Sequence, residues 1–191
     1  MSDSPYTSVF DPQLPDRPGK ALPWGRLPGA SAALVAAEAA GRHDGLVVVV
    51  TADTAAADRL ETELKVFAGD LPVFAFPDWE TLPYDVFSPH PDIVSRRLWT
   101  LSRLPDLTRG ILVVPVANLL QRLTPKKYIA GSSLLLDVGQ TLDLDATRRR
   151  LEANGYHCVP QVVEHGDSPV RGSILDLYPT AATRPARIEL F

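Results

Sequence analysis

Residues 46–69, LVVVVTADTAAADRLETELKVFAG, decide the fold class, because a strand signal stands directly before a helix signal. The first part, LVVVVTA, is a continuous β-branched run of the kind found in a strand that is covered on both faces. In the second part Leu60, Leu64 and Phe67 recur at helical spacing, and Gly69 ends the helix. The segment therefore predicts one strand followed by one helix.

The same alternation continues on both sides of this segment. A run of strong helix formers, GASAALVAAEAA at 29–40, comes before it, and VFAF from Val73 comes after it as a second apolar strand. Asp92 then caps another helix, and ILVVPV from Ile111 is a third strand. Strands that alternate with helices build a parallel sheet with helices on both faces. The sequence therefore predicts an α/β domain over residues 22–125.

After Pro125 the pattern changes. A helix capped by Asp143 or Asp145 is followed by strand-like pieces with turn-rich connections, which is typical of an α+β unit with an antiparallel element. This second, smaller domain is predicted over residues 126–191. Its strand-like pieces are SLLLDV from Ser133, CVPQVVEHG from Cys158, RGSILDLYP from Arg171 and ARIELF from Ala186.

The composition excludes several classes of protein. The 191 residues carry 19 basic and 23 acidic side chains, so the net charge of −4 argues against a chain that coats nucleic acid through bulk charge. The single cysteine cannot form an internal disulfide, which favours a reducing, cytosolic setting. No apolar run reaches the roughly 18–20 residues that span a bilayer, so we expect no membrane association. Residues 1–21, rich in proline, are predicted to form an extended arm.

Residues 25–33, GRLPGASAA, form a glycine-bearing turn that enters a helix, the place where nucleotide-binding domains hold phosphates. A working P-loop also needs a lysine for the phosphates and a Ser or Thr for Mg²⁺. Ala32 and Ala33 stand at those positions, and the nearest of only four lysines, Lys20, is distant. We interpret Gly29, Ala32 and Ala33 as a degenerate phosphate turn without a cofactor, with retained ATP binding as the rival hypothesis.

Other chemical sites find little support. The aromatic and proline-rich segment 78–90, DWETLPYDVFSPH, holds three acids and His90, but we interpret it as a loop held on its own domain, or as a partner surface. Cys158 lies in an apolar run, and the histidines lack ligand spacing, so neither a catalytic nucleophile nor a metal site is expected. The arginine run 148–150 is either a solvated helix face or a DNA contact.

The last 21 residues, from Arg171, read as a hairpin of two strand-like pieces. Alternation along the second piece would project Arg187, Glu189 and Phe191 from one face. Arginine forms forked hydrogen bonds to carboxylates and a phenyl ring fills a pocket, which are the contacts that anchor protein interfaces. The pattern is equally compatible with an ordinary solvated sheet face.

Four segments resemble the N-terminal region of a bacterial family, the transcription-repair coupling factors (Mfd). They are DWETLPYDVFSPH at 78–90, DIVSRRLWTL at 92–101, GILVVPVANLLQR at 110–122 and VVEHGDSPVRGSILDLYP at 162–179. The resemblance runs from about residue 22 to the end of the sequence. It implies a UvrB-like first domain, related to P-loop and RecA-like domains with a decayed ATP site, and a second domain that binds the nucleotide-excision repair protein UvrA.

Carried over residue by residue, the UvrA-contacting positions of the family fall on Arg171, Arg187 and Phe191. The resemblance also implies that the intact cytoplasmic protein meets RNA polymerase stalled at a lesion, displaces it with a translocase that uses ATP and Mg²⁺ on double-stranded DNA, and recruits UvrA. That translocase would lie beyond Phe191, so we expect this chain to be non-catalytic. The alternative function is a UvrB-like domain that binds ATP or DNA.

Overall fold

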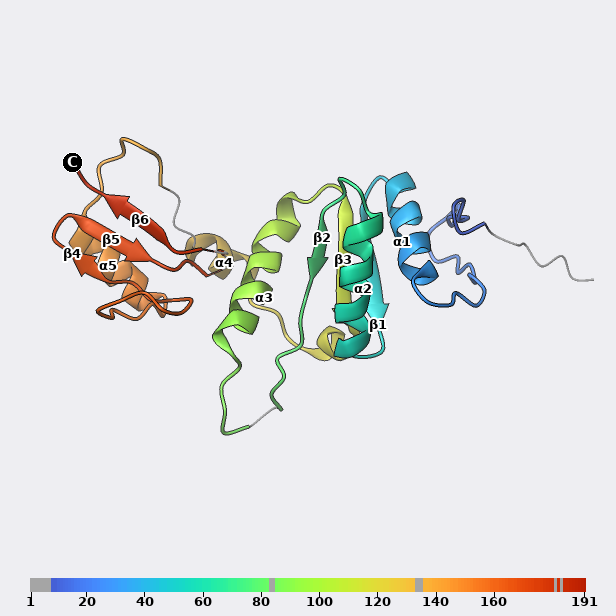
Figure 1. Cartoon of the computed structure of the whole chain (residues 1–191), viewed down its shortest axis with the longest axis horizontal. Coiled ribbons are helices and arrows are strands. Elements are labelled where there is room, and N and C mark those ends of the chain that lie inside the picture. The colour runs from blue at the N-terminus through green and yellow to red at the C-terminus, as the bar shows by residue number, and fades with distance from the viewer. Residues whose placement is uncertain (1–7, 83–84, 133–135, 181, 183) are drawn as a thin grey trace, which may run out of the picture. The chain divides into compact units, whose positions relative to one another are not determined.

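Figure 1 presents the computed structural model of the chain, which describes residues 8–82, 85–132, 136–180, 182 and 184–191. By their internal contacts, the described residues up to Asp78 form one compact unit with Leu104–Gln121. Trp79–Arg103 and Arg122–Phe191 form the other. The division into an arm and two domains at residues 21 and 125 stays a prediction.

A three-stranded parallel sheet forms the centre of the first unit, as predicted. Its strands are β1 (Leu46–Thr51), β2 (Val73–Ala75) and β3 (Gly110–Pro115), in the order β1-β3-β2. Every residue of β3 is buried, because this apolar strand has a neighbour on each side. Both β1 and β2 pair with β3 in parallel, with Leu46 opposite Gly110 and Val73 opposite Ile111.

Two helices cover one face of this sheet, α1 (Ser31–Arg42) and α2 (Thr54–Phe67). The Asp53 side chain caps α2 by accepting a hydrogen bond of 2.7 Å from the backbone N–H of Ala56. Small side chains on α1 allow it to approach the sheet closely. The buried core of the unit consists of Ala33, Ala36, Ala37, Ala40, Ala57, Leu64, Ala68, Ile111 and Val113.

The expectation that β1 is covered on both faces is wrong. Val47 and Val49 pack against the core beneath α1 and α2, whereas Val48 and Val50 are each 48% exposed. The reason is geometric, since successive side chains of a strand point to opposite faces and both helices lie on the same side. Two short 3₁₀ helices, Leu104–Asp106 and Val116–Leu120, flank β3.

The second unit contains a three-stranded antiparallel sheet, which confirms the mixed fold class. Asp143 caps one of its helices by accepting a hydrogen bond of 2.9 Å from the backbone N–H of Ala146, so the structure selects Asp143 over Asp145. The strands follow the order β4-β5-β6. The helices are α3 (Pro91–Arg103), α4 (Lys126–Ser132) and α5 (Leu144–Ala153), and the strands are β4 (Val170–Arg171), β5 (Ile174–Leu177) and β6 (Ala186–Glu189).

Two strand predictions of the second unit have other outcomes. The start of SLLLDV, residues 133–135, lies outside the described residues. The prediction of a strand from Cys158 is wrong, because residues 158–166 form an irregular loop with turns. The Asp167 carboxylate accepts hydrogen bonds of 2.8 Å from the backbone N–H groups of both Val163 and Glu164, and this folds the loop back on itself.

The small sheet uses one face for its core. Leu175 and Leu177 of β5 are buried against Leu151 of α5. The partly buried side chains that complete this cluster are Leu144, Tyr156, Val170 and Ile188. The opposite face of the sheet is therefore left to polar side chains.

Candidate protein-binding site

The polar face of the small sheet brings together residues from all three of its strands. On β5, Leu175 and Leu177 point to the core, so Ile174 and Asp176 point to the other face. Asp176 stands opposite Arg187 of β6, and Ile174 stands opposite Arg171 of β4. Residues directly opposite each other share a face, so Arg171, Asp176 and Arg187 lie on one surface, together with Glu189, which stands opposite Ile174.

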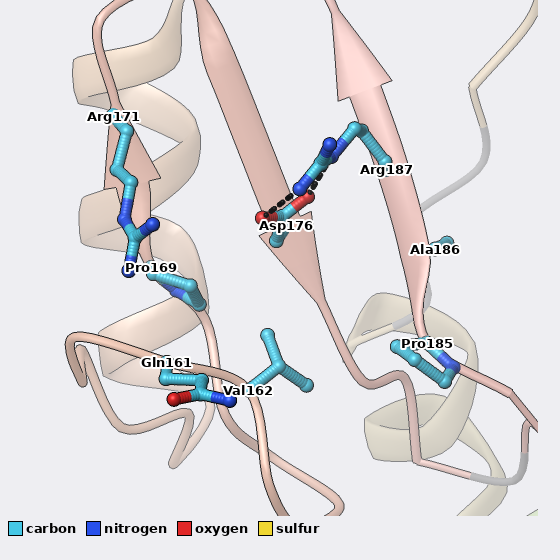
Figure 2. A pocket seen from close by; sticks show the side chains of 8 residues that line it. All are labelled: Gln161, Val162, Pro169, Arg171, Asp176, Pro185, Ala186 and Arg187. Carbon is cyan, nitrogen blue, oxygen red and sulfur yellow. Dashed lines mark hydrogen bonds and ion pairs between the residues drawn. The ribbon is translucent and has the colours of Figure 1, made fainter.

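Arg187 and Asp176 form a forked ion pair across the hairpin, drawn with dashed lines in Figure 2. The guanidinium donates from Nε to Oδ1 at 2.6 Å and from Nη2 to Oδ2 at 3.0 Å. Such paired hydrogen bonds fix the plane of the guanidinium as well as its position. The Arg187 side chain is 59% exposed, whereas that of Asp176 is only 19% exposed.

The pKa of the Asp176 carboxyl is lowered below its ordinary value, first by the hydrogen bond from Arg187. Burial opposes this shift, while the positive charges of Arg187 and Arg171 add to it. The pKa of Arg187 is raised by the same hydrogen bond and by the charge of Asp176. Both groups are therefore ionised at neutral pH, and the pair persists there.

Arg171 is also held by an acceptor within the chain. Its Nη2 donates a hydrogen bond to the backbone carbonyl of Pro160, in the loop that replaces the predicted strand. Arg171 is the last residue of β4, and Gly172 follows it with φ +60°, a left-handed conformation that glycine adopts without strain. The tight turn at residues 172–173 therefore places Arg171 next to β5.

The two arginines line one hollow of about 470 Å³, which we call the arginine pocket. Figure 2 shows Arg171 and the Asp176–Arg187 pair on neighbouring strands, with the loop residues Gln161 and Val162 nearby. The lining residues are Gln161, Val162, Pro169, Arg171, Asp176, Pro185, Ala186 and Arg187. An open surface that combines fixed cations with proline and valine suits an acidic protein partner.

Phe191 is exposed on the same unit but does not line the arginine pocket. The backbone N–H of Leu190 donates to the carbonyl of Ser173 at 3.0 Å, which extends the pairing with the 172–173 turn beyond β6. The structure thus joins two of the three predicted partner-binding residues in one hollow and leaves the third as a separate exposed ring.

Sequence reasoning did not identify Asp176 or the loop residues of the pocket. The alternation in ILDLYP at 174–179 already puts Asp176 on the face opposite Leu175 and Leu177. Its partner Arg187 could not be assigned, because the hairpin register depends on a long connection between β5 and β6 rather than on a two-residue turn.

The degenerate phosphate turn lies at the start of α1. Gly29 has φ +57°, and the Ser31 hydroxyl donates to the carbonyl of Pro28 at 2.6 Å. Ala33 is fully buried in the core of the first unit, and Ala32 is partly buried. The positions that a P-loop uses for its lysine and its Ser or Thr therefore carry methyl groups, and Ala33 packs against other apolar side chains.

The remaining candidate residues lie in loops and on helix faces, in the part of the chain that the structure describes. In segment 78–90, Asp78 accepts a hydrogen bond of 3.1 Å from Gln121, while Leu82, Val86 and Phe87 are exposed. The arginine run 148–150 lies on the exposed side of α5.

Among the described residues, no three His, Cys, Asp or Glu side chains gather as metal ligands would. In the same part of the chain, every helix is too short or too polar to cross a membrane.

Comparison with known proteins gives one consistent family. Residues 134–191 match the family model of the UvrB interaction domain. The chain is 46% identical over 178 residues to the transcription-repair-coupling factor of Escherichia coli, a match that covers 93% of this chain and 15% of that protein. The factor of Haemophilus influenzae is 44% identical over 186 residues, which is 97% of this chain and 16% of the relative.

A more distant relative extends the match to almost the whole chain. The transcription-repair-coupling factor of Myxococcus xanthus is 34% identical over 194 residues, covering 98% of this chain and 16% of the relative. The chain thus spans about a sixth of the length of these relatives. The segments that carry the resemblance lie within these matches, and the resemblance is confirmed. The chain belongs to the transcription-repair-coupling factors, as the counterpart of their N-terminal region, with a UvrB interaction domain at residues 134–191.

Proposed function

We propose that this chain is a non-catalytic recruitment module that binds UvrA through the polar face of the β4-β5-β6 sheet. The observation that carries the proposal is the arginine pocket, in which Arg171 of β4 and Arg187 of β6 are held on one surface, on either side of β5. The match of residues 134–191 to the UvrB interaction domain supports it, because that domain contains both arginines. The partner surface would present carboxylates to the two guanidinium groups.

Phe191 supplies an apolar anchor next to this charged surface. Its ring is fully exposed in the chain, and burying a phenylalanine side chain in a partner pocket gains about 1.5–3 kcal/mol. Arginine and aromatic side chains dominate the energy of many interfaces, and truncating a central one costs about 2 kcal/mol or more.

The proposal extends to the whole protein to which such a chain belongs. In it, the module would recruit UvrA to lesions where RNA polymerase has stalled, in the cytoplasm. ATP-driven movement on double-stranded DNA would belong to other parts of the protein, because Ala32 and Ala33 stand where a P-loop has its lysine and its Ser or Thr. This chain would therefore bind neither ATP nor Mg²⁺, and it would act by attachment.

The test is the affinity of purified UvrA for the chain, measured by isothermal titration calorimetry. Arg171→Ala, Arg187→Ala and Phe191→Ala are each expected to weaken binding by about 30-fold or more. Val163→Ala, at an exposed position of the same unit outside the pocket, is the matched control and is expected to bind like the parent. Circular dichroism checks that each variant is folded. The proposal fails if all three folded variants bind UvrA as tightly as the parent.

A further inference from the structure

We infer that Asp176 is a positioning residue for the partner, which holds Arg187 in the orientation that receives a carboxylate. The inference rests on the proposed function, because it concerns how the arginine pocket binds UvrA. Asp176 is negatively charged, so it cannot itself attract the carboxylates of an acidic partner. Asp176 would act only through the arginine to which it is bonded.

The geometry of the pair determines which donors remain available. A guanidinium carries five N–H donors in one plane. Asp176 occupies Nε and one hydrogen of Nη2, so both hydrogens of Nη1 and the second hydrogen of Nη2 stay available on the far edge of Arg187. That edge matches a second carboxylate in the same forked manner. One guanidinium can thus bridge Asp176 and an acidic side chain of the partner.

Holding Arg187 in advance removes a cost from binding. The side chain is 59% exposed, and a free arginine at such a site would sample many rotamers. Immobilising a side chain of this kind on binding costs about 0.5–1.5 kcal/mol. The two hydrogen bonds to Asp176 order Arg187 before the partner arrives, so that cost falls on folding rather than on association.

The Asp176 side chain contributes little to the stability of the fold beyond this ion pair. Its backbone N–H donates to the carbonyl of Pro169 at 3.1 Å, and this hydrogen bond survives any change of the side chain. The core contacts of β5 belong to its neighbours Leu175 and Leu177. Asp176→Asn, which keeps the shape and removes the charge, is therefore expected to leave the fold intact.

The sign of the effect separates positioning from plain electrostatics. If Asp176 acted only as a surface charge, it would repel an acidic partner, and Asp176→Asn would bind UvrA more tightly. If it positions Arg187, the same substitution binds more weakly although it removes a repelling charge. The two explanations therefore predict opposite changes of the dissociation constant.

The experiment compares the affinity of UvrA for the parent, Asp176→Asn, Arg187→Ala and the double variant by calorimetry. Asp176→Asn is expected to weaken binding by about 3- to 10-fold. In the Arg187→Ala background the same substitution is expected to cost nothing further, because there is no arginine left to hold. Asp176→Glu keeps a carboxylate on β5 and is expected to restore part of the affinity.

A charge control lies on the other side of the sheet. Asp145→Asn removes the same charge from the first turn of α5, which packs on the core face, and is expected to bind like the parent. The inference is overturned if Asp176→Asn binds as tightly as the parent or more tightly, or if its effect persists without Arg187. Absence of binding by the parent itself would instead refute the proposed function.

Discussion

His165 Nδ1 lies 3.0 Å from Asp92 Oδ1, while its Nε2 lies 2.9 Å from the carbonyl oxygen of Ala182. The imidazole also stacks on the Tyr178 ring, with 4.0 Å between the ring centroids. His165 belongs to the loop at residues 158–166. Its side chain thus connects this loop with the first turn of α3 and with the connection between β5 and β6. The His165 side chain is only 16% exposed, whereas the side chain of its partner Asp92 is 62% exposed.

His165→Ala is expected to lower the free energy of unfolding by about 2 kcal/mol. Both ring partners are acceptors and a neutral imidazole carries one N–H, so one hydrogen bond and one aromatic contact, worth about 1 kcal/mol each, are lost together. Urea denaturation followed by circular dichroism measures the change. His90→Ala is the control, since His90 is 69% exposed and lies near the same carboxylate of Asp92, and it is expected to cost under about 0.5 kcal/mol. Equal stabilities of the two variants would contradict the role given to His165.

Gly110→Ala is expected to destabilise the parallel sheet of the first unit by about 1–3 kcal/mol. Gly110 has φ +149°, and a Cβ at this position would lie 2.8 Å from the carbonyl oxygen of Pro72. That oxygen accepts the backbone hydrogen bond of Ile111 at 2.9 Å, so it cannot move without loss of the β2–β3 pairing.

Gly41→Ala is the matched control for this substitution. Gly41 lies in α1, and a Cβ there would meet nothing within 4 Å. Alanine favours helices over glycine by about 1 kcal/mol, so the variant is expected to be as stable as the parent or more stable. Thermal denaturation of both variants decides the matter, and a Gly110→Ala protein that melts with the parent would show that the Pro72 carbonyl can give way.

The Asp176–Arg187 pair is expected to make stability depend on acid pH. The pKa of Asp176 is lower in the folded chain than the ordinary value of 3.8, so the folded state binds this proton less readily than the unfolded state. The stabilisation is therefore present above about pH 4 and is lost as the pH falls through the folded pKa. The difference in unfolding free energy between the parent and Asp176→Asn should shrink from pH 7 to pH 3. A constant difference over that range would argue against the ion pair.

Addition of ATP with Mg²⁺ is expected to leave the melting temperature unchanged. Ala32 carries no ammonium group for the phosphates, and Ala33, which is buried in the core, carries no hydroxyl for a metal ion. A ligand at 100 times its dissociation constant would stabilise the folded state by about 2.7 kcal/mol, which differential scanning fluorimetry detects. A rise that saturates with millimolar ATP would support the rival hypothesis of a UvrB-like nucleotide site.

Local sequence signals predict the elements of this fold well where their stabilisation is local. The helix predicted before Gly69 is observed as α2, Thr54–Phe67, because Asp53 caps its start and its apolar residues recur at helical spacing. The predicted strand from Cys158 fails because a competing local interaction wins: the carboxylate of Asp167 accepts hydrogen bonds from two backbone N–H groups, three and four residues before it. An apolar run alone does not show which backbone groups a later side chain will capture.

The features of the candidate site also fall into two groups, those that the sequence shows and those that only the tertiary structure shows. The sequence by itself determined that Arg187 and Phe191 follow a strand alternation and that the phosphate turn has alanine in place of lysine, because residue identity and period are local properties. Only the tertiary structure decided that Asp176 faces Arg187, that the Pro160 carbonyl receives Arg171, and that the two arginines line one pocket. Strand register and loop path decide those contacts, and both depend on burying Leu175 and Leu177 against α5 rather than on any local preference.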